Sequence, residues 1–441
     1  MKSNKLGIQK WLSFIVAGLI GQLAWAIENN YLNVYVFDCT GDASFITYMT
    51  VFSAVAATIT TLFMGALSDR LGKRKLFISA GYIIWGISIV LFAFLDYRKD
   101  YSILHAAGAN AAMLCGVFIV ILDCIMTFFG STANDAAFNA FVTDNTDTTN
   151  RGKVESVLSI LPLVAMIAVV LLQGMLVGEK KTPQDELNWL WFFVVFGGVT
   201  TISGAILLFL IPKDVKGPNK EEPYLKNIVH GFRPSVIKSR PELYIALTAF
   251  MIFSIGIQVF MPYFMVYVQS IRGFELVSTA GPILGVACVL TVVLGVFMDK
   301  IGKYKLVFSA LAAAVIGGLL LFFFMDQVGV IIGGIILMTG YLVSTAVLGA
   351  KIRDYTPEKE TGLFQGVRMV FIVMIPMVTG PFIGQWVSMI NGTWAPNDYG
   401  EMSVLPNQYI FLFAIIIIAL AVIPLIFLLK RERALNEQAS K

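Results

Sequence analysis

The feature that most constrains this chain is a motif that occurs twice. The first copy reads Gly65-Ala-Leu-Ser-Asp69-Arg70-Leu-Gly72-Lys73-Arg74-Lys75, and the second, 230 positions later, reads Gly295-Val-Phe-Met-Asp299-Lys300-Ile-Gly302-Lys303-Tyr304-Lys305. Each copy follows directly on a long apolar run. An internal repeat at a fixed offset indicates two homologous halves, and in a membrane chain it indicates two homologous helical bundles.

A second repeated motif supports this division. The stretch Asp144-Asn-Thr-Asp-Thr-Thr-Asn-Arg151-Gly152 matches Asp354-Tyr-Thr-Pro-Glu-Lys-Glu-Thr-Gly362, and both follow the fourth apolar run of their half. The offset is 210 positions here, so the first half holds 20 more residues between its two motifs. We expect the loop 96–108 and a long fourth helix to contain these extra residues.

The composition indicates that lipid covers much of the surface. Of the 441 residues, 57% are hydrophobic and only 14% are charged, whereas a soluble domain averages about 25% charged residues. The four cysteines, Cys39, Cys115, Cys124 and Cys288, lack the spacing of metal ligands, so we expect neither a zinc site nor a disulfide. Three of them are interpreted as packing residues in the membrane, and Cys39 as a residue of an outer loop.

Apolar runs predict twelve membrane-spanning helices, each of which needs about 20 residues. They cover residues 11–36, 44–67, 76–95, 109–142, 154–178, 189–211, 242–268, 276–298, 306–325, 328–350, 362–388 and 408–429. We therefore expect an all-α membrane protein with an N-terminal six-helix bundle (1–212), a middle loop (213–241) and a C-terminal six-helix bundle (242–441), related by a pseudo-twofold axis. Ala24-Trp-Ala26 imitates a signal-peptide cleavage site, but cleavage would remove the first helix of the repeat, and we expect none.

The basic residues predict the orientation. Of the 32 Lys and Arg residues, 26 lie at the termini and in alternate gaps between spans, and five lie in the opposite gaps. The positive-inside rule then places both termini and the middle loop in the cytoplasm, and we expect a protein of the plasma (inner) membrane. Residues 224–233 in the middle loop fit two interpretations, a short interfacial helix or a solvated linker.

With these motifs the chain resembles the major facilitator superfamily over nearly its whole length. The acid-base-glycine loop after the second and eighth helices is the best known signature of that superfamily. Within it, the chain looks most like the glycoside–pentoside–hexuronide cation symporters and the sucrose-type carriers. The residues that carry this similarity are Trp25-Ala-Ile-Glu28-Asn-Asn-Tyr31, the segment 134–144 and Gly366-Val-Arg368-Met-Val-Phe-Ile-Val-Met-Ile-Pro376.

The chain also departs from two branches of that superfamily. The melibiose-type sodium symporters carry paired aspartates on the second helix, but residues 56–64 contain no acid here. Their sodium site therefore cannot be carried over, and a proton is the expected coupling ion. Drug exporters often carry a Gly-Pro-rich motif on the fifth helix, which residues 154–178 lack, although Gly380-Pro381-Phe-Ile-Gly384 in the eleventh span resembles it.

Glu28 lies well inside the first predicted span, where a carboxylate costs about 3 kcal/mol. Helical spacing puts it on one face with Tyr31 and Tyr35, beside a second stripe of amide and indole side chains. Such a surface suits a sugar, which has hydroxyls at the ring edge and C–H groups on its faces. Burial disfavours the charged carboxylate, so Glu28 is also the predicted carrier of the coupling proton. The alternatives are a structural acid bonded to another helix and an acid that simply lies at the membrane interface. The residues of this helix predicted to bind substrate are Gln22, Trp25, Glu28, Asn29 and Tyr31.

Asp123 begins a polar stripe on the fourth predicted helix. Thr127, Gly130 and Asn134 follow it at helical spacing, which indicates either the wall of a water-filled cavity or hydrogen bonds that only support packing. We predict that Asp123 takes part in proton coupling and that Thr127 and Asn134 bind substrate.

In the second half, the 230-residue offset places Gln258 opposite Glu28, and Gln258, Tyr263 and Tyr267 are predicted to bind substrate. Arg368 lies inside the eleventh span, where it either pairs with an acid or extends to the cytoplasmic interface.

The repeated loops are predicted to act as a conformational switch. The resemblance implies that they hold the cytoplasmic side closed, with Asp69 facing a helix N-terminus or a base of the other bundle. The alternative is that their basic residues serve topology alone. The predicted switch residues are Asp69, Arg70, Arg74, Asp144, Arg151, Asp299, Asp354 and Arg368.

The expected function is proton-coupled symport of a sugar or glycoside by a lipid-embedded monomer that needs no cofactor or metal and binds no nucleic acid. An exporter of amphipathic compounds is the alternative, and a non-transporting nutrient sensor a more remote one. The two histidines, His105 and His230, join no catalytic cluster, and no phosphate-binding glycine loop occurs. We therefore expect neither an enzyme nor an ATP-driven pump.

Overall fold

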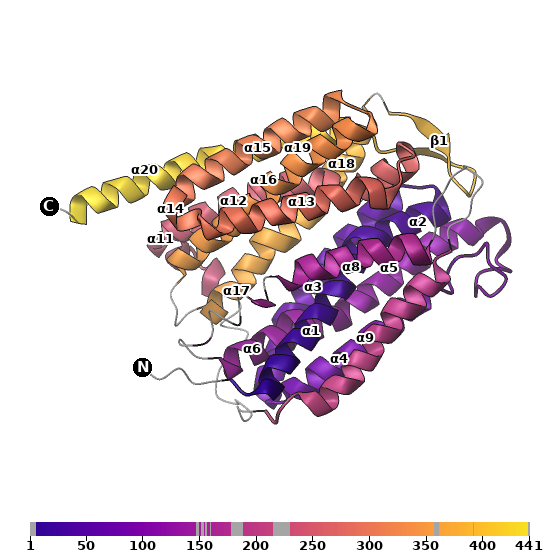
Figure 1. The fold of residues 1–441 in the computed structure, drawn as a ribbon, viewed down its shortest axis with the longest axis horizontal. Coiled ribbons are helices and arrows are strands. Elements are labelled where there is room, and N and C mark those ends of the chain that lie inside the picture. The colour runs from indigo at the N-terminus through magenta and orange to yellow at the C-terminus, as the bar shows by residue number, and fades with distance from the viewer. Residues whose placement is uncertain are drawn as a thin grey trace. The chain divides into compact units, whose positions relative to one another are not determined.

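The computed structural model describes residues 6–146, 150, 154, 157–158, 160–177, 188–214, 230–356, 361–390 and 392–439. Figure 1 shows that the described chain is almost entirely helical, with one two-stranded sheet. It divides into two compact units. Unit 1 comprises Met1–Glu222 and Ala395–Ser403, and unit 2 comprises Pro223–Trp394 and Val404–Lys441.

Unit 1 contains the helices of the first half of the chain. They are α1 (Ile8–Ala26), η1 (Ile27–Tyr31), α2 (Leu32–Thr40), α3 (Ser44–Leu71), α4 (Arg74–Phe92), η2 (Gly108–Asn110), α5 (Ala111–Gly130), η3 (Ser131–Phe138), α6 (Asn139–Asn145), α8 (Leu161–Leu176) and α9 (Leu190–Leu210).

Unit 2 contains the helices of the second half. They are η4 (His230–Phe232), α11 (Pro234–Ser239), α12 (Pro241–Val266), η5 (Tyr267–Ile271), α13 (Leu276–Val296), α14 (Met298–Ile301), α15 (Lys303–Phe323), α16 (Gln327–Tyr355), α17 (Thr361–Met369), η7 (Val370–Met374), α18 (Ile375–Ser388), α19 (Tyr409–Leu420) and α20 (Val422–Ala439). Strands β1 (Trp394–Pro396) and β2 (Met402–Val404) form a hairpin between α18 and α19.

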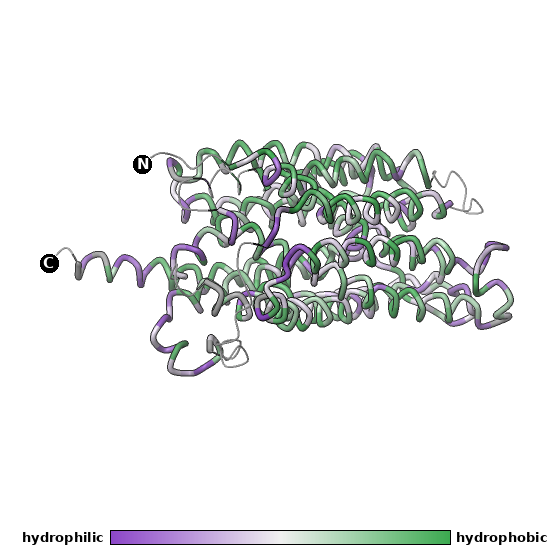
Figure 2. Tube along the Cα trace, turned by 90° about the horizontal axis from the view of Figure 1, so that it is seen from below, coloured by the Kyte–Doolittle hydropathy of each residue, from purple (hydrophilic) through white to green (hydrophobic). Residues whose placement is uncertain are grey.

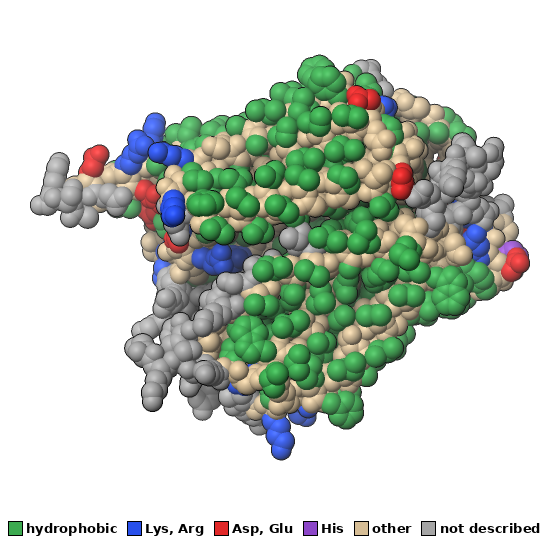
Figure 3. All heavy atoms as spheres, in the orientation of Figure 1, with side chains coloured by type: hydrophobic (Ala, Val, Ile, Leu, Met, Phe, Trp, Pro, Cys, Tyr) green, Lys and Arg blue, Asp and Glu red, His purple; other side chains and the backbone are tan. Residues whose placement is uncertain are grey.

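The described helices confirm the expected all-α membrane class. Eleven of them are long and apolar enough to cross a bilayer, and the apolar stretch Val164–Leu176 of α8 is a shorter one in the position of the fifth predicted span. Figure 2 shows hydrophobic residues along the helices and hydrophilic ones mainly in the connections and at helix ends. On the face drawn in Figure 3, hydrophobic side chains cover much of the described surface of both units. Large apolar side chains such as Phe209, 85% exposed, and Val296, 74% exposed, suit contact with lipid.

Small residues let helices within each unit approach closely. A Cβ added to Gly86 of α4 would lie 2.3 Å from Thr201 Oγ1 of α9, and one added to Gly317 of α15 would lie 2.3 Å from the Leu337 nitrogen of α16. Lipid gives no hydrophobic drive for helices to associate, so close backbone packing supplies much of the attraction.

Two long helices of unit 1 contain wider, π-helical turns. In the first, η1 joins α1 to α2, and the continuous apolar helix runs over Ile8–Thr40. The expectation that Cys39 belongs to a loop is therefore wrong, because Cys39 is a buried residue of α2. In the second, η3 joins α5 to α6, and the combined helix covers Ala111–Asn145. It is the long fourth helix expected from the sequence, and π-helical turns of this kind often occur at functional sites.

The segment 224–233, which fits either an interfacial helix or a solvated linker, lies largely outside the described residues. From His230 onward, η4 and the short helix α11 lead directly into α12. Their side chains Phe232, Arg233, Ile237 and Lys238 are all exposed.

Candidate functional site

The wide turn η1 directs Glu28 into the interior of unit 1. The side chain is 7% exposed, and its Oε1 accepts a hydrogen bond of 2.8 Å from the Thr127 hydroxyl of α5. Its second oxygen has no hydrogen-bond partner among the described residues. A buried carboxyl group with one donor and one unpartnered oxygen can carry either a charge or a proton.

Asp123 lies one turn before Thr127 on α5 and is only 1% exposed. Neither of its carboxyl oxygens has a partner of acceptable hydrogen-bond geometry within the described part of the chain, although the Ser53 side chain of α3 lies nearby. Glu28 interacts electrostatically with both Asp123 and Asp135. Because like charges in a medium of low dielectric repel strongly, the charged forms of these carboxyl groups oppose one another.

A cavity of about 290 Å³ lies in unit 1 between α1, η3, α6 and the chain leading into α8. Its wall combines amide, carboxyl and aromatic groups with apolar ones. The lining residues are Gly18, Gln22, Trp25, Asn134, Asp135, Phe138, Asn139, Leu158 and Leu161. Such a lining can hydrogen-bond a polar ligand and also cover its apolar faces.

Close packing fixes the polar wall of this cavity. The Tyr82 hydroxyl of α4 lies 2.7 Å from the Ala17 carbonyl oxygen and 3.1 Å from Asn134 Oδ1. A Cβ added to Gly21 would lie 2.5 Å from Asn134 Oδ1 and 2.6 Å from the Tyr82 hydroxyl. Only glycine at position 21 therefore lets α1 approach η3 this closely. The Asn134 amide nitrogen in turn lies 3.4 Å from Asp135 Oδ1.

An aromatic pair supports the opposite part of the wall. The ring of Trp25 lies 4.9 Å from that of Trp85, centroid to centroid, and Trp85 is fully buried. A Cβ added to Gly130 would lie 2.7 Å from the Trp85 ring. The stripe residue Gly130 thus makes room for the indole that supports Trp25.

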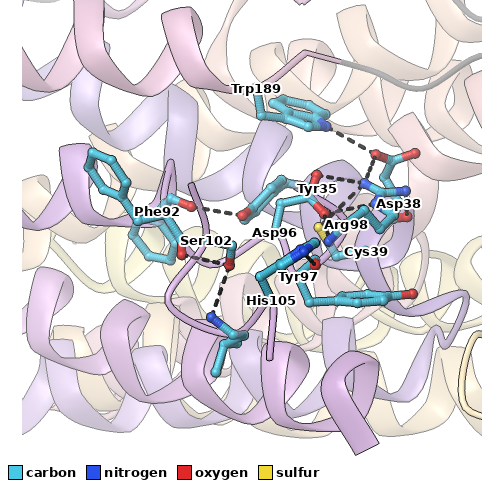
Figure 4. Close-up of polar contacts among 12 residues, drawn as sticks. Tyr35, Asp38, Cys39, Phe92, Asp96, Tyr97, Arg98, Ser102, His105 and Trp189 are labelled. Carbon is cyan, nitrogen blue, oxygen red and sulfur yellow. Dashed lines mark hydrogen bonds and ion pairs between the residues drawn. The ribbon is translucent and has the colours of Figure 1, made fainter. Parts of the chain in front are cut away.

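A buried ionic cluster holds the far end of α2 in place (Figure 4). Arg98 Nη2 lies 2.9 Å from Asp38 Oδ2 and Arg98 Nε lies 2.8 Å from Asp96 Oδ1, while Trp189 Nε1 donates to Asp38 Oδ2 at 3.2 Å. Burial alone would lower the pKa of Arg98, but the hydrogen bond to Asp96 and the charge of Asp38 raise it above its ordinary value. The cluster ties the helix that carries Glu28 to the α4–α5 connection and to α9.

The predicted face of Glu28, Tyr31 and Tyr35 is divided in the structure, so the prediction of a single stripe is wrong. Glu28 turns toward α5, whereas the Tyr31 ring packs against Phe192 of α9 at 5.5 Å and the Tyr35 hydroxyl donates to the Phe92 carbonyl at 2.7 Å. The π-helical turn between them breaks the 3.6-residue spacing on which the prediction depended. Asn29 is exposed and donates to the Trp25 carbonyl of its own helix.

The Asp123 stripe reaches the cavity only at Asn134, its last residue. Thr127 bonds Glu28, Gly130 packs on Trp85, and Asn134 alone of the four lines the cavity. The cavity continues along η3 and α6 through Asp135 and Asn139.

The predicted residues of unit 2 lie on α12 and η5. Gln258 packs beside Gly380 of α18, and the Tyr263 hydroxyl donates to the Pro381 carbonyl at 2.8 Å. The Tyr267 ring packs on Phe411 at 5.3 Å, and its hydroxyl has no partner among the residues described. Arg368 is half-buried in α17, close enough to Arg353 to interact with it electrostatically.

The two repeated motifs meet in space within each unit. Arg74 Nε lies 3.3 Å from Asp144 Oδ2 in unit 1, and Lys303 Nζ lies 2.7 Å from Asp354 Oδ2 in unit 2. Arg70 is exposed. Asp69 lies in the last turn of α3, and Asp299 lies in α14. The side chains of both, and the whole of Arg151, lie outside the described part of the chain.

Several residues of the site were not predicted from the sequence. Asp135 lines the cavity, while Tyr82, Trp85 and Gly21 support its wall. Spacing along one helix gives no sign of Tyr82 and Trp85, which come from α4. Asp135 follows directly on a predicted residue, but an ordinary α-helix would place neighbours about 100° apart.

Comparisons with known proteins come from sequence and from structure. The model of the Major Facilitator Superfamily matches residues 11–348 and 289–441. A comparison with curated protein sequences finds no significant match.

Several solved structures share the fold. The nucleoside transporter NupG aligns at a TM-score of 0.69 with 10% identity, over 95% of this chain and 99% of its own. The inward-facing, occupied form of a bacterial homologue of the human lysosomal transporter Spinster aligns at 0.67 with 13% identity, over 97% and 98% of the two chains. The xylose transporter XylE from E. coli, in a partially occluded inward-open form, aligns at 0.65 with 13% identity, over 93% and 97%.

Proposed function

Because the chain belongs to the major facilitator superfamily, and is thus an integral membrane transporter, we propose that it carries out proton-coupled symport of a neutral polar substrate of the sugar or glycoside class. The observation that carries this proposal is the pairing of a buried acidic group with an adjacent polar cavity in unit 1. Glu28 and Asp123 form the acidic group, and Trp25, Asn134 and Asp135 belong to the cavity wall.

The cavity chemistry supports a substrate with several hydroxyl groups. Gln22, Asn134 and Asn139 supply amide donors and acceptors, and Asp135 supplies an acceptor that can bind two hydroxyls at once. The Trp25 indole offers an apolar face for the C–H groups of a sugar ring. An amphipathic cation would leave most of these amide groups unpaired, which costs about 1–3 kcal/mol for each buried group.

The acidic group supports coupling to a proton. Glu28 and Asp123 lie in the interior without a basic partner at hydrogen-bond distance in the described residues, so protonation removes a charge at small structural cost. In an alternating-access cycle, coupling requires that the proton and the substrate both favour the same state. Glu28 lies on the helix that also carries Gln22 and Trp25, so its charge acts close to the substrate-binding wall.

The test is uptake by the purified chain in lipid vesicles. Radiolabelled monosaccharides, disaccharides and nucleosides are offered with and without an imposed inward proton gradient. The proposal expects gradient-driven accumulation of at least one sugar and a matching alkalinisation outside the vesicles. Gradient-driven efflux of hydrophobic cations without sugar uptake would overturn it in favour of an exporter.

A further inference from the structure

The tip of the hairpin between α18 and α19 belongs to unit 1, although the helices on either side of it belong to unit 2. Residues 395–403 pack on the turn that joins α2 to α3. The Asp398 amide donates to the Thr40 carbonyl at 3.0 Å. Gly41 has a φ of +64°, and a Cβ there would lie 3.3 Å from the Asn397 Cα. The turn and the hairpin backbone are therefore in direct contact.

Asp42 is the centre of this contact. Its side chain accepts hydrogen bonds from the Ser403 hydroxyl at 2.8 Å, from the Ser44 amide at 2.8 Å and from the Tyr399 hydroxyl. Asp42, Asn397 and Ser403 are all buried. One carboxylate thus joins the middle and one end of the hairpin tip to its own turn.

The hairpin is built to present these groups. Asn397 Oδ1 accepts from the backbone amides of Tyr399 and Glu401, and Gly400 takes a φ of +87°. The Asn397 amide donates to the Glu401 carbonyl at 2.8 Å, which closes the loop. This internal bonding fixes the tip before it meets Asp42, so little entropy is lost on contact.

We propose that residues 395–403 are a strap that ties the connection between α18 and α19 to the α2–α3 turn, with Asp42 as its anchor. In the alternating-access cycle of the proposed function, on which this consequence rests, a movement that pulls the hairpin tip away from that turn must break the Asp42 bonds. The strength of the anchor then sets how readily the tip leaves the turn.

Hydrogen–deuterium exchange of the full chain in lipid nanodiscs, without substrate, tests the anchor. Tyr399→Phe and Asp42→Asn are compared with Glu401→Gln, a matched control because Glu401 is an exposed acid of the same hairpin. Hydrogen bonds to a charged group contribute enough that the first two variants should exchange the amides of 395–403 about tenfold faster or more. The control should exchange them at the wild-type rate, and α12 should be unchanged in all variants.

Wild-type exchange rates of the hairpin in both Tyr399→Phe and Asp42→Asn would overturn the strap. If Asp42→Asn loosens every helix, Tyr399→Phe alone decides, since it removes only a hydroxyl. The readout needs no transport, so a chain that takes up no sugar but shows the faster exchange loses the proposed function and keeps the strap.

Discussion

The Thr127 hydroxyl of α5 donates to Glu28 Oε1 at 2.8 Å, so one hydrogen bond joins the two helices that carry the acidic group. The donor is 1% exposed and the acceptor 7% exposed. This bond connects a group able to carry a proton to the helix that continues into the cavity wall.

Replacing Thr127 by valine tests that bond. The side chain keeps its shape but loses the donor, leaving the Glu28 carboxyl unpaired, and we expect a loss of about 1.5–3 kcal/mol in stability when Glu28 is charged. Thermal unfolding in detergent measures this loss of stability, and proton-driven uptake measures the effect on transport. Thr132→Val is the control, because among the described residues the Thr132 hydroxyl bonds the Phe128 carbonyl of the same continuous helix and not a carboxyl group. Equal unfolding midpoints for the two variants would contradict the assignment.

Gly21→Ala should disrupt the cavity wall. The added methyl group would lie 2.5 Å from Asn134 Oδ1, so α1 and η3 must separate, which costs about 1–3 kcal/mol. We expect a lower unfolding midpoint and a higher KM for substrate. Gly198→Ala on α9 is the matched control, since a Cβ there meets nothing within 4 Å. A Gly21→Ala protein that behaves like Gly198→Ala would show that the helices are not packed this closely.

The ion pairs that join the two repeated motifs in each unit should differ in strength. The Arg74 and Asp144 side chains are 10% and 7% exposed, whereas those of Lys303 and Asp354 are 26% and 46% exposed. Removing one partner of a buried pair costs about 3–5 kcal/mol, and removing one of an exposed pair costs about 1 kcal/mol or less. Arg74→Gln should therefore lower the unfolding midpoint clearly more than Lys303→Gln, with the exposed Arg70→Gln as control. The reverse order would contradict the burial of the first pair.

The hairpin contact should be insensitive to pH across the neutral range. Burial alone would raise the pKa of Asp42, but hydrogen bonds from Tyr399, Ser44 and Ser403 outweigh it and lower the pKa below its ordinary value. A lowered folded-state pKa gives stability that is complete above the unfolded value, about 4, and is lost as the pH falls through the folded value.

The other titratable groups near Asp42 leave this expectation unchanged. Burial, followed by the bond to Asp42 and the charge of Glu401, raises the pKa of Tyr399 above its ordinary value, so its hydroxyl keeps the proton. Amide exchange of 395–403, corrected for its intrinsic pH dependence, should be equal at about pH 5 and pH 7 and faster only below about pH 4. Loss of protection between pH 7 and 5 would contradict the assignment.

Much of the fold could be predicted because it depends on patterns that repeat along the sequence. Long apolar runs predict the spans, and the duplicated loops at Gly65 and Gly295 predict two homologous halves. The same repeats also contain the residues that pair in space, Arg74 with Asp144 and Lys303 with Asp354. Such pairings follow from duplication, because each half brings its two motifs to the same end.

The site was less predictable because its geometry departs from the ideal helix. Spacing of 3.6 residues puts Glu28 on a face with Tyr31, yet the π-helical turn η1 sends the first to α5 and the second to α9. Contacts between sequence-distant residues, such as Tyr82 with Asn134 or Asp42 with Tyr399, leave no periodic trace. They depend on how helices pack, which propensity and spacing do not encode.

Glu28→Gln is the most direct test of proton coupling. Glutamine keeps the size and the acceptor for Thr127 but cannot exchange a proton, and Glu275→Gln, an exposed glutamate of the second half, is the control. Uptake and counterflow of the sugar found in the vesicle screen are measured side by side. The account predicts that Glu28→Gln abolishes accumulation driven by a proton gradient while preserving counterflow, and that Glu275→Gln retains both. Gradient-driven accumulation at the wild-type rate in Glu28→Gln would contradict it.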